Sequence, residues 1–334
     1  MKIAVDAMGG DYAPKVVIEG AVAASKEYGC RIALVGIRER IEEELQKIGG
    51  CPEAIEIVHA SEIIQMNEPA ALSIRKKRDS SIIRALELIK QQKADAFFSA
   101  GNTGAGVCAA TLGLGMLSEV ERPGIAIIMP TVKKTPTLII DAGANIDAKP
   151  THLLQYAAMA QAYYRHIFNC DNPSVGLLNI GEEEAKGTDF VKETYRLLES
   201  SHLNFQGNVE GKDVFKGKTE IVICDGFVGN VTLKVSEGVA EAFGVLLKRE
   251  LTSSLMAKIG SLFVYPALRR FKKNFDYSEY GGAPLLGVNG IVIIGHGRSS
   301  AKAIKNAIRV AIKEVENNVN QKMLESVRKL TYNV

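Results

Sequence analysis

The chain has few of the residues and patterns that would assign it to a narrow functional class. Its five cysteines are scattered and odd in number, and none forms a C-x-x-C pair. Its five histidines lie far apart, and none has the H-x-x-x-H spacing of a metal-binding helix. We therefore expect reduced core thiols, no metal site and no bound cofactor.

Other absences concern location and partners. No run of uncharged apolar residues approaches the roughly 18 that a transmembrane helix needs. The N-terminus lacks the apolar core of a signal peptide and reaches an acidic residue at Asp6. The formal net charge of +3 is too small to indicate a nucleic-acid partner. With 46% hydrophobic and 24% charged residues, the composition is that of a globular protein, and we expect it in the cytoplasm.

Short runs rich in valine and isoleucine alternate with longer amphipathic stretches. The runs have strand length and are mostly apolar on both faces, as expected for strands covered by helices on two sides. They occupy residues 2–6, 31–36, 54–59, 95–100, 124–129, 136–141, 174–180, 220–225 and 290–295. Helical patterns occupy residues 14–28, 38–48, 80–92, 104–117, 151–168, 184–199, 229–257 and 299–328. The alternation predicts a doubly wound, mainly parallel α/β sheet in one domain spanning 1–334, with a helical insertion at 230–280.

Strand after strand is followed by a turn of glycine, asparagine or aspartate. Such turns are AMGGD, GNTGAG, DAGANID, NIGEEEAKG, DGFVGN and GHGRSS, and YGGAPLLG is read as a further turn before the last strand. Ligands of open parallel sheets bind beyond the carboxyl ends of the strands, where glycines and helix N-termini let backbone amides approach an anion. A tight turn explains any one glycine, but the repetition predicts a large polar ligand site along one side of the sheet.

Familiar catalytic motifs fit this sequence poorly. Residues 104–109 (GAGVCA) match the G-x-G-x-x-G/A string of dinucleotide-binding turns, but the next strand ends in Met129 and Pro130 instead of the required acid. Residues 211–219 (GKDVFKGKT) carry Lys212 where a P-loop needs glycine, and are expected to form a solvated loop. No G-x-S-x-G elbow is present. Acidic residues near strand ends could bind Mg²⁺, but capping of neighbouring turns explains them more simply.

What remains is a basic, amide-rich site without an obvious nucleophile. Cationic side chains beside the strand ends are Lys149, Lys186, Lys234, His296 and Arg298. A separate basic run is formed by Arg75, Lys76, Lys77 and Arg78. Such a run is either a solvated face or a docking surface for an anionic partner.

Six blocks carry a resemblance to a known family. MKIAVDAMGGDYAPK, SAGNTGA, DAGANIDAKPTHLLQYA, LLNIGEEEAKG, DGFVGNVTLK and YGGAPLLGVNG, in this order, resemble the PlsX-type phosphate acyltransferases of bacterial phospholipid synthesis over essentially the whole chain. The resemblance implies a fold similar to phosphate acetyltransferases and to isocitrate- and isopropylmalate-dehydrogenase-like proteins. It also implies a homodimer that transfers a long acyl chain from acyl carrier protein to inorganic phosphate. A membrane glycerol-3-phosphate acyltransferase would then use the acyl phosphate.

Inorganic phosphate is already an anionic nucleophile, so this chemistry needs no nucleophilic side chain. Under this hypothesis the amides and side chains of Asn102, Thr103 and Gly104 bind phosphate. The side chains expected to complete the catalytic pocket are Asn230, Lys234 and His296, the last as general acid or oxyanion donor. The residues expected to support them from behind are Asp6, Asp141, Asn145, Asp225 and Lys186.

The segment 251–275 is the second candidate for an anionic partner. It contains five basic residues and no acidic one, namely Lys258, Arg269, Arg270, Lys272 and Lys273. Pro266 is expected to divide it into two amphipathic pieces. Contact with acyl carrier protein, with a membrane surface or with a dimer partner all fit the pattern.

Two other functions remain open from the sequence. One is a phosphate acetyltransferase-like enzyme that uses acyl-CoA. The other is a non-catalytic scaffold that binds membrane and acyl carrier protein. Phosphate-dependent thiol release from different acyl donors would separate the three.

Overall fold

The computed structural model describes residues 1–133, 135–275 and 281–331, and of residues 271–275 and 331 it describes the backbone alone. Within these ranges the strands are β1 Lys2–Asp6, β2 Arg31–Gly36, β3 Ile55–His59, β4 Ala96–Ser99, β5 Gly124–Met129, β6 Thr137–Ile140, β7 Val175–Leu178, β8 Phe205–Val209, β9 Ile221–Ile223, β10 Ala283–Leu286 and β11 Ile291–Ile294. The helices are α1 Lys15–Tyr28, α2 Arg38–Lys47, α3 Ala70–Lys76, α4 Ser81–Lys90, α5 Thr103–Leu114, α6 Pro150–Phe168, α7 Asp189–Glu199, α8 Gly211–Lys216, α9 Gly226–Leu251, α10 Leu255–Phe275, α11 Ala301–Glu316 and α12 Val319–Thr331.

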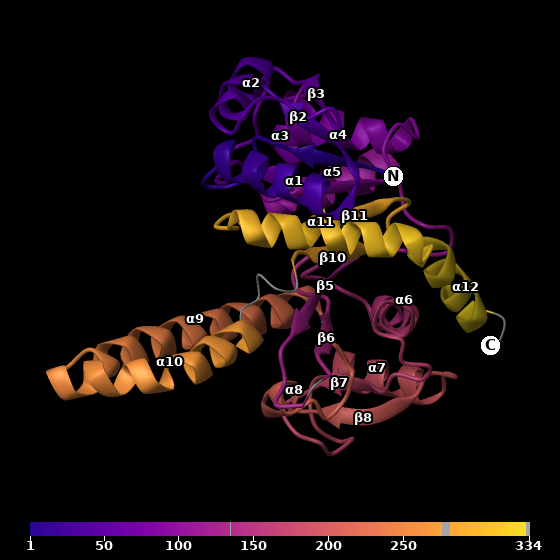
Figure 1. Ribbon diagram of the computed structural model, residues 1–334. Coiled ribbons are helices and arrows are strands. Elements are labelled where there is room, and N and C mark those ends of the chain that lie inside the picture. The colour runs from indigo at the N-terminus through magenta and orange to yellow at the C-terminus, as the bar shows by residue number, and fades with distance from the viewer. Residues whose placement is uncertain (134, 276–280, 332–334) are drawn as a thin grey trace.

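The strands form one mixed, mostly parallel sheet in the order β3-β2-β1-β4-β11-β10-β5-β6-β9-β7-β8 (Figure 1). The strands β3, β2, β1, β4 and β11 are parallel to one another, and so are β6, β9, β7 and β8. Between the two groups, the pairings β11–β10, β10–β5 and β5–β6 are antiparallel. The predicted α/β fold class is confirmed.

Three successive reversals make the two parallel groups run in opposite directions. The carboxyl ends of β1, β4 and β11 therefore point the opposite way from those of β6, β9 and β7. The prediction that all polar turns share one side of the sheet is wrong for this reason. No sequence signal distinguished the short antiparallel strand β10, which contains Pro284, from a turn.

Helices cover both faces of the sheet, because alternate strand residues point to opposite sides. In β1, Ile3 and Val5 pack into the cluster under α1 and α11, whereas Ala4 packs into the cluster under α4 and α5. In β6, Leu138 and Ile140 face α6 and α12. Each fully buried aliphatic side chain of this kind contributes about 1.5–3 kcal/mol, so burial on both faces stabilises the strand runs.

Helices α9 and α10 pack against one another and project away from the sheet as a long hairpin (Figure 1). Pro266 lies inside α10, so the prediction that it divides the segment is wrong. An interior proline removes one backbone hydrogen bond, and α10 continues through Pro266 to Phe275. Among the described residues, no helix is long and apolar enough to cross a membrane.

Two further expectations differ from the structure. Residues 211–216 form the short helix α8, which ends at Gly217 in a left-handed conformation, so the expected loop is wrong. The stretch expected as one helix over 299–328 is two, α11 and α12. The break falls at Asn317 and Asn318, where Asn318 has a φ of 50°. Asparagine tolerates that left-handed conformation better than most residues.

Candidate functional site

The turn after β4 leads directly into the first turn of α5. Asn102 caps this helix, since its Oδ1 accepts from the N–H of Ala105 at 3.0 Å and its carbonyl accepts from Gly106 at 2.9 Å. The remaining first-turn N–H groups are those of Thr103 and Gly104, which have no acceptor within the helix. Both residues are exposed. These two donors, at a helix N-terminus, suit an anion.

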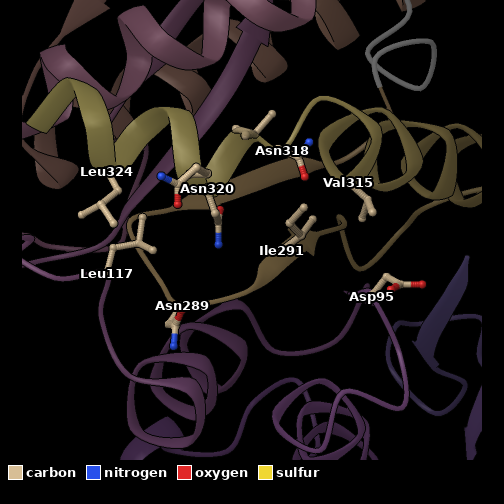
Figure 2. Close-up of a pocket in the computed structure, with 10 residues that line it drawn as sticks. Asp95, Leu117, Asn289, Ile291, Val315, Asn318, Asn320 and Leu324 are labelled. Atoms are coloured by element: carbon tan, nitrogen blue, oxygen red, sulfur yellow. The ribbon is translucent and has the colours of Figure 1, made fainter.

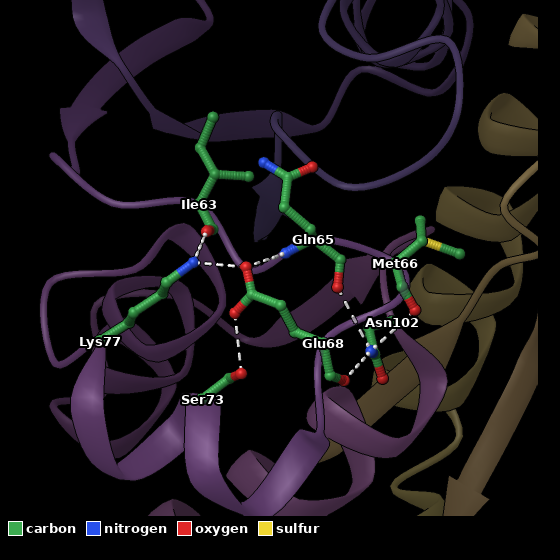
Figure 3. A network of polar contacts seen from close by, with 7 residues as sticks. All are labelled: Ile63, Gln65, Met66, Glu68, Ser73, Lys77 and Asn102. Atoms are coloured by element: carbon green, nitrogen blue, oxygen red, sulfur yellow. Dashed lines mark hydrogen bonds and ion pairs between the residues drawn. The ribbon is translucent and has the colours of Figure 1, made fainter.

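The other end of the Asn102 side chain anchors a loop (Figure 3). Its Nδ2 donates to the carbonyl oxygens of Gln65, Met66 and Glu68 at 3.3, 3.0 and 2.9 Å. The Glu68 carboxylate accepts in turn from Ser73 at 2.8 Å and from Lys77 at 2.5 Å. Both functional atoms of the Asn102 side chain thus bind the protein. The structure places Asn102 at the predicted phosphate turn as a cap and an anchor.

Asp6, at the end of β1, supports the same turn from below. Its Oδ2 accepts from Ser99 Oγ at 2.7 Å, and that hydroxyl accepts from the N–H of Gly101 at 3.0 Å. Burial raises the pKa of Asp6, and hydrogen bonds from the Ser81 and Ser99 hydroxyls oppose the rise. A Cβ on Gly9 would lie 2.5 Å from Asp6 Oδ2 and 2.7 Å from the Gly101 nitrogen. Only glycine fits at position 9.

The turn after β11 completes this first cluster. The N–H of Asp11 donates to the carbonyl of Gly297 at 2.8 Å, which joins the turns after β1 and β11. His296 is exposed, and its Nδ1 accepts from the N–H of Arg298 at 3.2 Å. Because Nδ1 accepts this hydrogen bond, a neutral His296 ring carries its proton on Nε2. A Cβ on Gly297 would meet Met66 Cε at 2.8 Å, so the loop anchored by Asn102 also reaches this turn.

A second cluster surrounds Asp141, just after β6. Its carboxylate accepts from the N–H groups of Ile125, Gly143, Ala144 and Asn145 at 2.7–3.0 Å. Burial raises the pKa of Asp141, and these hydrogen bonds oppose the rise.

Asn145 extends this turn toward α6. Its Nδ2 donates to the hydroxyl of Tyr156 at 2.7 Å and to the carbonyl of Pro123. Its carbonyl accepts from the N–H of Gly226 at 2.9 Å. Asp141 and Asn145 thus hold one rigid turn, on which α9 begins.

The start of α9 packs very closely on that turn. A Cβ on Gly229 would lie 1.8 Å from the carbonyl oxygen of Asp141, and one on Gly226 would lie 2.5 Å from the carbonyl oxygen of Asn145. Asp225 caps the helix by accepting from the N–H groups of residues 227 and 228 at 2.9 and 3.0 Å. The first N–H groups of α9 are therefore already paired, unlike those of α5.

The second cluster instead presents side chains. Asn230 is exposed and lies over Gly143. A Cβ added to Gly143 would lie 3.0 Å from Asn230 Nδ2. Lys234 follows one turn later, exposed and 2.9 Å from Glu237. Ala105 of α5 and Ala142 beside Asp141 belong to one continuous apolar cluster, so a single core supports both polar clusters.

The remaining predicted residues lie on other turns and helices. Lys186 is exposed in the turn after β7, where its carbonyl accepts from Asn179. Arg75, Lys76 and Arg78 are exposed at the end of α3, whereas Lys77 pairs with Glu68. On α10, Lys258, Arg269 and Arg270 are exposed. The side chains of Lys272 and Lys273 lie outside the described residues.

Two hollows of about 370 Å³ each are open to the surface. One lies at the amino ends of β4 and β11, beside the junction of α11 and α12, and contains none of the predicted residues (Figure 2). The other lies at the base of α9 and includes Asn230 and Lys234. Over the described ranges, no group of three or more histidine, cysteine, aspartate or glutamate side chains could hold a metal ion.

Sequence reasoning missed Ser99, Glu68 and Tyr156. Ser99 ends a buried strand directly before the candidate turn, a position that could have drawn attention to it. The contact between Glu68 and Asn102 spans 34 residues and has no local signal.

Comparison with known proteins places the chain in a family. A model described as "Fatty acid synthesis protein" matches residues 1–322. A protein of Dictyoglomus turgidum named phosphate acyltransferase is 52% identical over 332 residues, covering 99% of both chains.

The fold also resembles solved structures. A phosphotransacetylase from Streptococcus pyogenes has a TM-score of 0.66 at 18% identity, covering 95% of this chain and 94% of its own. A 4-hydroxythreonine-4-phosphate dehydrogenase from Klebsiella pneumoniae has a TM-score of 0.53 at 14% identity, covering 94% and 99%. The predicted likeness to phosphotransacetylases and to a dehydrogenase fold is confirmed. With its full-length match to the family model and its close relative, the chain belongs to the phosphate acyltransferase family.

Proposed function

We propose that the protein transfers a long-chain acyl group from acyl carrier protein to inorganic phosphate, giving acyl phosphate for phospholipid synthesis. The observation that carries this proposal is the 52% identity, over 99% of both chains, to a protein named phosphate acyltransferase. The fatty acid synthesis family description supports a fatty acyl donor. The product would be consumed by an acyltransferase that acts on glycerol 3-phosphate.

The reaction requires little covalent help from the protein. A phosphate oxygen forms a bond to the thioester carbonyl carbon, and the carbon–sulfur bond breaks after the tetrahedral intermediate. The electron pair leaves on sulfur, and a thiol pKa near 8.5 makes the thiolate a good leaving group. The protein's task is to orient phosphate and stabilise the oxyanion.

In this proposal phosphate lies at the first turn of α5. The open N–H groups of Thr103 and Gly104 are its donors, and Asn102 fixes the turn that presents them. Asn230 and Lys234 would complete the pocket from α9 across the apolar cluster that α5 and α9 share, although the strand ends beneath the two helices point in opposite directions. His296 serves as general acid or oxyanion donor through Nε2, because its Nδ1 is oriented by the N–H of Arg298.

The supporting residues hold the turns of the site in fixed positions. Asp6 holds the phosphate turn through Ser99. Asp141, Asn145 and Asp225 hold the turn on which α9 begins, and so position Asn230. Lys186 would contribute positive charge from the turn after β7.

The basic surfaces suit the two anionic partners. Acyl carrier proteins are acidic, and the exposed Arg75, Lys76 and Arg78 lie close to the loop anchored by Asn102. On α10 the apolar side chains of Leu255, Met256, Leu262 and Phe263 are exposed together with basic ones, as in helices that lie on anionic membranes. We propose peripheral contact of α10 with the inner face of the cell membrane, and a homodimer as the working form.

Donor choice tests the proposal against its alternatives. Phosphate-dependent thiol release is measured with hexadecanoyl-acyl carrier protein, hexadecanoyl-CoA and acetyl-CoA. Preference for the acyl carrier protein donor supports the proposal. Preference for acetyl-CoA would indicate a phosphate acetyltransferase-like enzyme, and no release from any donor would indicate a scaffold.

A further inference from the structure

One ion pair beside the first polar cluster has no part in the chemistry proposed above. Glu68 Oε1 lies 2.5 Å from Lys77 Nζ, and their side chains are only 24% and 30% exposed. The carboxylate also accepts from the hydroxyl of buried Ser73 at 2.8 Å, and the ammonium donates to the carbonyl of Ile63 at 2.7 Å (Figure 3). The Lys77 ammonium holds the pKa of Glu68 below its ordinary value of 4.5, so the carboxylate is charged at neutral pH.

This pair joins both ends of a loop to one helix. The loop spans residues 63–68, and Lys77, the residue directly after α3, contacts it at Ile63 and at Glu68. Residues 65–67 between these points are exposed, so burial contributes little to fixing their backbone. Ordering exposed residues costs conformational entropy, which the polar contacts at the two ends offset. The shape of the loop therefore depends on the pair.

The loop in turn holds the turn after β4. Asn102 Nδ2 donates to the carbonyl oxygens of Gln65, Met66 and Glu68 at 3.3, 3.0 and 2.9 Å. An amide nitrogen carries two hydrogens, so three carbonyls converge on it only within a narrow range of loop shapes. On the other side of the loop, Met66 Cε lies 2.8 Å from the place that a Cβ on Gly297 would take. The loop thus contacts the turns after both β4 and β11.

We propose that Glu68 and Lys77 are positioning residues of the phosphate site and act through Asn102. Neither side chain contacts phosphate in this arrangement. The pair fixes the loop, the loop carbonyls fix Asn102 Nδ2, and Asn102 Oδ1 caps α5 beside the open N–H groups of Thr103 and Gly104. The inference rests on the proposed function, since it assumes that phosphate binds at this turn.

Lys77 thereby differs from the basic residues on either side of it. Lys76 and Arg78 are exposed and available to an anionic partner, whereas Lys77 binds the loop. Removing one member of a partly buried ion pair leaves the other without its counter-charge. Loss of the Lys77 charge should therefore be felt at the phosphate turn rather than at a docking surface.

The test removes the charge of Lys77 and then restores it. Lys77→Met keeps an apolar stem and loses the ammonium, whereas Lys77→Arg keeps a cation that can bind Glu68. Lys305→Met is the matched control, because Lys305 is 24% exposed and lies 2.6 Å from Glu27, a pair that joins α11 to α1. Each variant is compared with wild type for kcat and for the KM for inorganic phosphate at saturating hexadecanoyl-acyl carrier protein. Calorimetry measures equilibrium binding of phosphate to the same proteins.

Lys77→Met should raise the KM and the Kd for phosphate about three- to tenfold, since partly exposed hydrogen bonds between charged groups are lost. Its kcat at saturating phosphate should change less than about twofold, because the pair does not contact the reacting atoms. Lys77→Arg and Lys305→Met should behave as wild type. In an Asn102→Ala background, Lys77→Met should add less than about twofold to the KM, because the loop no longer acts on the turn.

An unchanged KM for phosphate in Lys77→Met would overturn the inference. An equal rise in Lys305→Met, which would reflect general destabilisation, would overturn it too. Full additivity with Asn102→Ala would have the same consequence, because Lys77 would then act by a route other than Asn102. If wild type binds phosphate with an affinity that depends on Lys77 but transfers no acyl group to it, the proposed function alone fails. If wild type neither binds phosphate nor transfers an acyl group to it, both fail.

Discussion

The side-chain nitrogen of Asn102 lies 2.9 Å from the carbonyl oxygen of Glu68, and the Glu68 carboxylate binds Lys77 and Ser73 (Figure 3). One asparagine thus joins the first turn of α5 to a loop 34 residues earlier. Its Oδ1 caps the helix, and its Nδ2 anchors the loop. The open N–H groups of Thr103 and Gly104 depend on both contacts for their position.

Substitution of Asn102 should therefore weaken the phosphate dependence of the rate. Asn102→Asp keeps the capping oxygen but replaces the donor with an acceptor that faces three carbonyl oxygens. Asn102→Ala loses both contacts. We expect the KM for phosphate to rise about tenfold in each variant, since each variant loses several partly exposed hydrogen bonds that contribute about 0.5–1.5 kcal/mol apiece. Asn67→Ala, in the same loop, is the control, and a normal KM in Asn102→Ala would refute the placement.

The close approach of α9 to the Asp141 turn makes a second prediction, on stability. In Gly229→Ala the new Cβ would lie 1.8 Å from the Asp141 carbonyl oxygen, so helix and turn must separate. We expect a loss of about 1–3 kcal/mol in the free energy of unfolding. Gly238→Ala, in the same helix with no atom within 4 Å of its Cβ, should be neutral or stabilising by up to about 1 kcal/mol. Chemical denaturation compares the two, and equal losses would contradict the packing.

A third prediction concerns Glu314, which α11 buries beside Tyr163. Burial raises the pKa of Glu314 to about 8, partly opposed by the hydrogen bond from the Tyr163 hydroxyl. The folded chain thus retains a proton that the unfolded chain releases above its ordinary pKa of 4.5. Stability from this group is full below that value and is lost as pH rises through about 8.

Glu314→Gln removes this titration and keeps a partner for Tyr163. The free energy of unfolding of the variant should increase relative to that of wild type as pH rises from about 5 to about 8. Denaturant titrations at a series of pH values measure the difference. A difference that is constant with pH would contradict the buried, protonated carboxyl.

Charge reversal should distinguish the roles of the basic surface on α10 and the basic surface at the end of α3. Arg269→Glu/Arg270→Glu should lower co-sedimentation with anionic phosphatidylglycerol vesicles about tenfold or more, because each basic residue contributes about 1 kcal/mol at such a surface. Arg75→Glu/Lys76→Glu should raise the KM for acyl carrier protein instead. Each pair is the control for the other. Unchanged vesicle binding in the first pair would argue against membrane contact by α10.

The sequence predicted the strands better than their directions. Buried runs such as residues 2–6 and 124–129 match β1 and β5 to the residue, because valine and isoleucine runs between turns are a strong local signal. The strand β8 was missed because its sequence, FQGNV, is polar and contains glycine. The reversals at β10 and β5 are decided by tertiary pairing, which local patterns do not encode.

The candidate site was predicted to a similar extent. The turns themselves were found, since glycine and asparagine after a buried strand are visible in the sequence. The sequence did not predict that Asn102 pairs with the loop at Glu68. It also did not predict that the first N–H groups are paired in α9 but have no acceptor within the helix in α5. Both depend on where side-chain oxygens lie in three dimensions, as with Asp225, which occupies the N–H groups of α9.

The most direct test of the account is detection of the product. Wild-type protein is incubated with hexadecanoyl-acyl carrier protein and inorganic phosphate, and acyl phosphate is followed by phosphorus NMR alongside free thiol. The account predicts one acyl phosphate for each thiol released, with a rate that saturates in phosphate. Thiol release that proceeds without phosphate, or without acyl phosphate appearing, would contradict it.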